Sequence, residues 1–200
     1  MRVGVLASGA GTNLQALLDT VHGHEAQIVA VASDKPDAPA LERAARRGIP
    51  TATFARSDHA DREGRDLAMA AWLSEQGAEL VVLAGYMQLL SGPFLQQFSD
   101  RVVNVHPALL PAFPGIDAIG QAVAYGVRVA GVTVHLVDEG VDTGPIILQA
   151  CVEVGDVADA EGLHDLLRPL EHALLPEAVR LLARGAVRRD PENPRRLLVG

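Results

Sequence analysis

The chain has 200 residues, which fit one domain or one and a half, and its 48% of apolar residues can form a sizeable core. Its formal net charge of −8 argues against a general nucleic-acid binder, which needs a basic surface, but leaves room for a small anionic ligand in a local pocket. No apolar run reaches the roughly 18 residues of a membrane span, and the first apparent strand begins at Arg2 and leaves no room for a signal peptide. The single cysteine, Cys151, excludes an internal disulfide and a multi-thiolate metal site. We therefore expect a cytoplasmic protein that binds neither nucleic acid nor membrane.

Strands and helices alternate along the first hundred residues. Apolar runs predict strands over 2–7, 27–33, 51–54 and 80–84, and helical stripes begin at Leu14 and cover 40–47, 59–76 and 93–98. Such alternation predicts an open, mainly parallel sheet with helices on both faces. On spacing alone, Arg62 and Arg65 near the start of the third helix indicate a solvated face.

A glycine turn, Ser8-Gly9-Ala10-Gly11-Thr12-Asn13, separates the first strand from the first helix. Free amides at a helix start can hold an anion, and glycines let the anion come close. The dinucleotide fingerprint also requires a glycine where Leu14 stands, so that motif is incomplete, although Asp34 lies where a ribose-binding acid would fall. The alternative is a tight turn in which Thr12 or Asn13 caps the helix.

The centre of the chain is a β-branched run, 102–106, that stops at Pro107 and continues into a proline-rich loop ending at Gly115. Asn104 and His106 lie two residues apart, so their side chains leave a strand on the same face. They would project from the carboxyl end of a strand, where open α/β sheets carry their ligands. We expect the function here.

The second half predicts a helix at 118–125, strands at 129–137 and 146–154, and a helix at 163–182 that is kinked or broken at one of its two prolines. No long helix separates the two strands, so we expect them to be antiparallel. Cys151 lies in an apolar strand, which favours a small core residue over a nucleophile. For the tail from Gly185 the sequence predicts a loose hairpin or a partly disordered segment.

Asn104, His106 and Asp142 are the candidate catalytic groups. An imidazole titrates near neutrality, a nearby carboxylate favours its protonated form, and an amide can stabilise an oxyanion. A structural histidine and a turn-forming aspartate remain the alternative. The other histidines show no metal-ligand spacing, so we predict no catalytic metal.

Three motifs carry a resemblance to a known family: Ser8 to Asn13, Asn104-Val105-His106-Pro107 with Leu109-Leu110-Pro111, and Asp142-Thr143-Gly144-Pro145-Ile146. From residue 2 to about residue 180 the chain resembles the phosphoribosylglycinamide formyltransferase family. The resemblance implies a Rossmann-like formyltransferase fold in a single domain, 1–200, with a phosphate-binding half (1–100), a catalytic and folate half (101–185) and a tail (186–200). It also implies formyl transfer from 10-formyltetrahydrofolate, as co-substrate, to the amine of 5-phosphoribosylglycinamide in de novo purine (IMP) biosynthesis.

The resemblance assigns a role to each matching residue. His106 would be the general acid, Asn104 would stabilise the oxyanion, and Asp142 would raise the pKa of His106. The substrate-binding residues would be Gly11, Thr12, Asn13 and Glu171, and the folate-binding residues Arg62, Met87, Gln88, Leu89, Leu90, Asn104, Val137 and Asp138. Two departures are that Gln88 stands where arginine or lysine is common, and that 116–120 lacks a histidine found in many relatives.

Other functions fit fewer of these features. Another folate formyltransferase or hydrolase of the same fold, such as methionyl-tRNA formyltransferase or formyltetrahydrofolate deformylase, would need a further domain. A non-catalytic sugar-phosphate-binding module would not need the three catalytic groups. The assignment as a dehydrogenase is supported only by Gly9, Gly11 and Asp34. We expect a monomer or a homodimer with small-molecule substrates.

Overall fold

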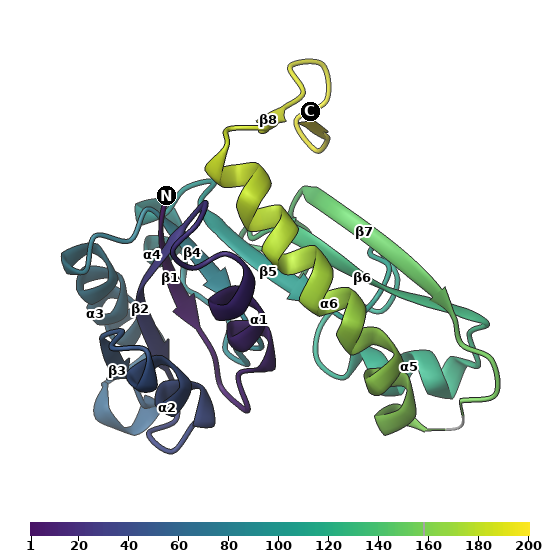
Figure 1. Cartoon of the computed structure of the whole chain (residues 1–200), viewed down its shortest axis with the longest axis horizontal. Coiled ribbons are helices and arrows are strands. Elements are labelled where there is room, and N and C mark those ends of the chain that lie inside the picture. Colours follow the sequence, from purple (N-terminus) through teal and green to yellow (C-terminus); the bar gives the residue numbers. More distant parts are fainter. Residues whose placement is uncertain (158) are drawn as a thin grey trace. The chain divides into compact units, whose positions relative to one another are not determined.

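The computed structural model describes residues 1–157 and 159–200. It divides into two compact units, Met1–Asn104 and Val105–Gly200 (Figure 1). The division falls within strand β5 (Val102–His106), which therefore carries Asn104 at the end of one unit and His106 at the start of the other. The two candidate residues thus keep the two-residue spacing that strand geometry requires for side chains on one face.

The first unit is built on parallel strands. These are β1 (Arg2–Leu6), β2 (Gln27–Ser33), β3 (Thr51–Thr53) and β4 (Leu80–Leu83). β1 pairs in parallel with both β2 and β4, and β4 pairs in parallel with β5. All four residues of β4 are buried, as are the last four of β1. Continuous burial of this kind requires the near-unbroken apolar runs seen in the sequence.

The helices of this unit follow the strands in alternation. They are α1 (Thr12–Thr20), α2 (Pro39–Arg46), the short 3-10 helix η1 (Arg56–Asp58), α3 (Arg62–Glu75) and α4 (Gly92–Gln97). Asp61 fixes the start of α3 by accepting a hydrogen bond from the Gly64 amide at 2.7 Å. α3 packs so close to β1 that a Cβ on Gly4 would lie 2.7 Å from Leu73 Cδ2. α1 packs against α2, and α3 against α4.

The second unit combines an antiparallel strand pair with a long helix (Figure 1). Its elements are α5 (Ala118–Tyr125), β6 (Val129–Leu136), β7 (Ile146–Glu153), α6 (Ala160–Ala183), β8 (Val187–Arg189) and β9 (Leu197–Val199). β6 and β7 are antiparallel, and α6 packs on both. The hydrogen-bonded order of the sheet is β3-β2-β1-β4-β5-β6-β7. The predicted fold class, a mainly parallel sheet with antiparallel strands toward the C-terminal end, is confirmed.

Two local expectations need correction. Helix α6 is continuous through Pro169 and Pro176, because it buries an apolar face that includes Leu163 and Leu175 and this burial outweighs the lost backbone hydrogen bonds. Cys151 is exposed, since β7 is the last strand in the order and buries alternate residues at most. The tail from Gly185 forms the hairpin, one of its two predicted alternatives, with β8 and β9 paired antiparallel. Within the described residues, no helix is both long and apolar enough to cross a membrane.

Candidate functional site

The glycine turn of the first unit rests directly on helix α2. Gly11 is the N-cap of α1 in the left-handed conformation (φ 72°), and no side chain caps this helix. A Cβ on Gly11 would lie 2.8 Å from both Cα and Cβ of Ala40, so only glycine fits. The Ala40 amide donates to Gly9 O at 3.2 Å, and Arg43 Nε donates to Ala10 O at 2.8 Å. Thr12 and Asn13 therefore lie inside the first helical turn, where amides without an intrahelical partner can face an anion.

The segment Met87–Leu90 follows β4 and is held at both ends by buried side chains. The Met87 amide donates to Ser8 Oγ at 2.9 Å, and the Ser91 amide donates to Asp66 Oδ2 at 2.7 Å. Met87 and Leu89 are 63% and 58% exposed although they are large and apolar. An anchored main chain with exposed apolar side chains is suited to a flat, partly apolar ligand.

The prediction that Arg65 lies on a solvated face is wrong. Its side chain is buried, because Nε and Nη2 both donate to Asp66 Oδ1, at 2.9 and 2.7 Å, and this pairing compensates the buried charge. Its Nη1 lies 3.5 Å from Gln88 Oε1. A guanidinium is therefore present beside residue 88, where the resemblance led us to expect the loss of a positive charge. Arg62, by contrast, is exposed.

Asp34, considered above as a ribose-binding acid, is engaged inside the protein. Its Oδ1 accepts from Ser8 Oγ at 2.5 Å and its Oδ2 accepts from Gln88 Nε2 at 3.0 Å. Both carboxylate oxygens thus bind neighbouring loops of the same unit. This arrangement removes the main support for the dehydrogenase alternative.

His106 lies buried at the end of β5, with an acceptor at each ring nitrogen. Its Nδ1 lies 3.3 Å from Asp142 Oδ2, and its Nε2 lies 2.9 Å from Phe113 O. A carbonyl and a carboxylate can only accept, so both contacts are satisfied together when the ring carries two protons. Asn104, two residues earlier on β5, is half-buried.

Both oxygens of Asp142 face groups that can donate to them. Besides His106, the Gly115 amide donates to Oδ2 at 2.7 Å and His135 Nε2 lies 3.5 Å from Oδ1. Burial alone would raise the pKa of Asp142, but the hydrogen bonds from His135 and Gly115, together with the charges of both imidazoles, lower it overall. The carboxylate is therefore ionised at neutral pH.

His135 is the residue of this cluster that the sequence reasoning missed. It is buried on β6, and its Nδ1 lies 2.8 Å from Leu136 O, which leaves Nε2 to face Asp142. The available signal was period-two placement: Thr133 and His135 are polar residues at alternate positions of an otherwise apolar strand. Both are buried.

The loop that carries Asp142 is closed on itself and tied to the tail. Asp138 Oδ1 accepts from the Gly140 amide at 3.1 Å and from Thr143 Oγ1 at 2.6 Å. Arg195 Nη2 donates to Thr143 O at 2.7 Å. Val137, at the start of this loop, is half-buried, and Glu171 is a buried acid on α6.

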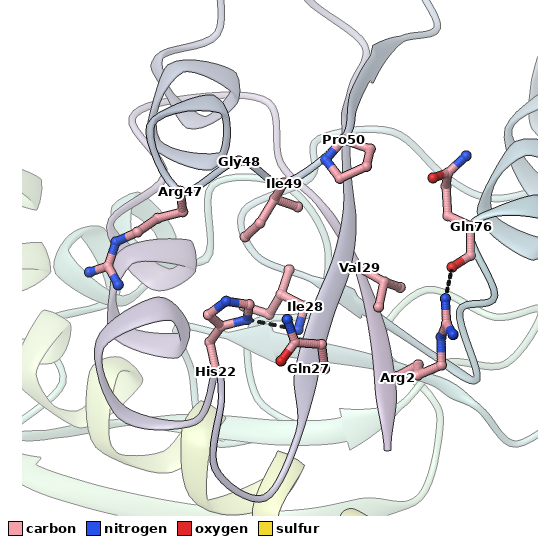
Figure 2. A pocket seen from close by; sticks show the side chains of 10 residues that line it. All are labelled: Arg2, His22, Gln27, Ile28, Val29, Arg47, Gly48, Ile49, Pro50 and Gln76. Atoms are coloured by element: carbon pink, nitrogen blue, oxygen red, sulfur yellow. Dashed lines mark hydrogen bonds between the residues drawn. The ribbon is translucent and has the colours of Figure 1, made fainter.

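A polar pocket of 280 Å³ lies in the first unit, at the amino ends of β1 and β2 (Figure 2). Its cations already have partners: Arg2 Nη2 donates to Gln76 O at 2.5 Å and Arg47 pairs with Asp19 at 2.7 Å. Because the glycine turn and the segment 87–90 follow the opposite, carboxyl ends of the strands, this pocket is not the candidate site. Within the described parts of the chain, no group of three or more His, Cys, Asp or Glu side chains is arranged so that it could hold a metal ion.

Comparison with known proteins gives consistent matches along the chain. A family model described as formyl transferase matches residues 1–179. The phosphoribosylglycinamide formyltransferase of Mycobacterium tuberculosis (strain ATCC 25618 / H37Rv) is 46% identical over 91% of this chain and 85% of its own length. The trifunctional purine biosynthetic protein adenosine-3 of Drosophila pseudoobscura pseudoobscura is 45% identical over 96% of this chain, which spans only 14% of that longer protein. The crystal structure of glycinamide ribonucleotide transformylase 1 from Symbiobacterium toebii matches with a TM-score of 0.95 and 45% identity, over 100% of this chain and 93% of that one.

Proposed function

This chain belongs to the formyl transferase family, and we propose that it transfers a formyl group from 10-formyltetrahydrofolate to the amine of 5-phosphoribosylglycinamide in de novo purine biosynthesis. Relatives named phosphoribosylglycinamide formyltransferase, 40% and 46% identical over most of their length, support the reaction. The observation that carries the proposal is the buried His106, whose Nδ1 lies 3.3 Å from the ionised Asp142 and whose Nε2 lies 2.9 Å from Phe113 O. A protonated imidazole held by a carboxylate is the group that a general acid requires.

The two substrates are assigned to separate parts of the chain. The phosphate of the acceptor would bind the main chain at Gly11, Thr12 and Asn13, where the left-handed glycine opens the start of α1. Glu171 would engage the amine end of the acceptor as a carboxylate. The folate would bind along the main chain of 87–90 and against Val137, Asn104 and Asp138, with its tail carboxylates at Arg62, since a guanidinium pairs well with a carboxylate.

The reaction would proceed by direct transfer without a covalent enzyme intermediate. The acceptor nitrogen attacks the formyl carbon and gives a tetrahedral intermediate whose oxyanion faces the Asn104 amide and protonated His106. The Nε2–H of His106 would exchange its contact with Phe113 O for the oxyanion, while Nδ1 stays on Asp142. The bond from this carbon to the folate nitrogen then breaks, and the attacking amine loses a proton while the folate nitrogen gains one. An oxyanion donor such as Asn104 contributes about 10²–10³ in rate in comparable chemistry, and holding two substrates together adds further acceleration.

We also propose that the chain acts as a single domain, as a monomer or a homodimer, in the reducing cytoplasm. An exposed lone thiol such as Cys151 suits a compartment that keeps thiols reduced.

A formyl-transfer assay tests the reaction. Purified protein is given 10-formyltetrahydrofolate with glycinamide ribonucleotide, tRNA or water as the acceptor, and we expect turnover with the first alone. Turnover with tRNA or water instead would assign another formyltransferase or a hydrolase of the same fold.

The role of His106 is tested in the same assay. His106→Ala should lower kcat by orders of magnitude while both substrates still bind, whereas the exposed His24→Ala should match the wild type. Unchanged turnover in the first variant would remove the general-acid role.

A further inference from the structure

The segment Met87–Leu90 is held by a continuous network of side chains from three elements of the first unit. On one side, Ser8 Oγ accepts from the Met87 amide at 2.9 Å and donates to Asp34 at 2.5 Å. On the other, Asp66 accepts from the Ser91 amide at 2.7 Å and from two nitrogens of Arg65. The network therefore fixes the amide of Met87, the first residue of the segment, and the amide of Ser91, the residue that follows the segment.

Gln88 links the two sides, and its surroundings allow one orientation of its amide. Its Nε2 donates to Asp34 at 3.0 Å, and its Oε1 faces Arg65 Nη1 at 3.5 Å. A carboxylate only accepts and a guanidinium only donates, so a flipped amide would place like groups against each other. A cation at this position would face Arg65 and an anion would face Asp34. The neutral side chain at position 88 is thus specified by its two neighbours.

The burial of the Arg65–Asp66 pair is itself informative. Asp66 is 0% exposed and Arg65 is 2% exposed. A buried ion pair is weak support for stability, because desolvation offsets the attraction between the charges. Its effect here is to orient the Asp66 carboxylate. Arg65 binds Oδ1, so Oδ2 is the oxygen that accepts from the Ser91 amide. The same carboxylate therefore couples the orientation of α3 to the end of the segment.

We propose that Asp66 and Arg65 are positioning residues for the formyl donor, which they orient through the main chain of Met87–Leu90. This inference rests on the proposed function, because it assigns the folate ring to that main chain. Neither side chain touches the folate. They act by holding the segment in one conformation before the ligand binds, so that binding does not have to order it.

Asp66→Asn is the primary test. A carboxamide has one acceptor and one donor end, so it must lose either the Ser91 amide or its contact with Arg65. We expect the KM for 10-formyltetrahydrofolate to rise about tenfold, equivalent to about 1.4 kcal/mol, while kcat and the KM for glycinamide ribonucleotide stay within about threefold. Exchange of the Ser91 amide hydrogen should accelerate by a similar factor.

Two further variants separate positioning from general stability. Leu73→Ala removes a fully buried side chain from the same helix, and it should lower Tm without changing the KM for the formyl donor. Arg65→Met combined with Asp66→Asn removes both buried charges, so it should regain stability relative to Asp66→Asn alone while the raised KM persists.

The outcomes distinguish the inference from the function on which it rests. If the Ser91 amide exchanges faster in Asp66→Asn and the KM for the formyl donor stays at the wild-type value, the positioning role is overturned. If Leu73→Ala raises that KM as much as Asp66→Asn does, the effect is one of stability and the inference fails. If the wild type neither binds nor uses the formyl donor, the proposed function itself fails, and the exchange data still report on the Asp66 contact.

Discussion

Gly11→Ala is the substitution that tests the phosphate-binding turn most directly. Gly11 has a φ of 72°, and an L residue in this left-handed region costs roughly 1–2 kcal/mol. The added Cβ would also lie 2.8 Å from the Cα of Ala40, well inside van der Waals contact. Ala40 is fixed in α2 and cannot give way freely, so overpacking adds about 1–3 kcal/mol. The turn must then move away from α2 by several tenths of an ångström.

Gly23→Ala is the matched control. Gly23 has a φ of 80°, but no atom lies within 4 Å of the Cβ that alanine would add. It therefore carries the backbone cost of roughly 1–2 kcal/mol and no clash. For a chain of this length each kcal/mol lowers Tm by roughly 2–4 °C, so Gly11→Ala should lower Tm about twice as far as Gly23→Ala.

The assay is steady-state formyl transfer with each variant, with Tm measured alongside by calorimetry. Gly11→Ala should raise the KM for glycinamide ribonucleotide about tenfold or more, because displaced amides no longer converge on the phosphate, and should leave the KM for the formyl donor close to the wild type. Gly23→Ala should leave both constants unchanged. A wild-type KM for glycinamide ribonucleotide in a folded Gly11→Ala protein would refute the assignment of the phosphate to this turn.

The remaining predictions concern charge. Asp142→Asn should lower kcat about 10- to 100-fold, the effect of losing a hydrogen bond to a charged partner, and should shift the alkaline limb of the pH–rate profile to lower pH; an unmoved limb would contradict the pairing with His106. Arg62→Ala should raise the KM for the formyl donor, so a pure loss of kcat would exclude it from binding the folate tail. Burial and the charge of Arg47 lower the pKa of His22 below 6.5, so the unfolded chain binds a proton more readily than the fold and stability should fall as the pH drops through 6.5. His22→Asn, which can still accept from the Ile28 amide, should reduce this dependence in urea unfolding at pH 5 and pH 8. The part that remains belongs to His172, whose pKa burial also lowers.

The sequence predicted the elements well where one local rule decided them. The runs at 27–33 and 118–125 became β2 and α5 with the same bounds, because a mostly buried apolar run and a glycine after Tyr125 left no competing choice. The burial of Arg65 could not be predicted from the sequence. Helical spacing does not reveal that the Asp66 carboxylate and the side-chain amide of Gln88, on another loop, compensate its charge. His135 was missed for a similar reason: its partner Asp142 becomes a neighbour only when the loop after β6 folds back.

The hydrogen bond from Arg195 to Thr143 O has a practical consequence for anyone trimming this protein. The family model ends at residue 179, which invites an expression clone that stops near the end of α6. Such a clone would discard a guanidinium that holds the carbonyl next to Asp142. Shortened versions should therefore be judged by turnover as well as by yield.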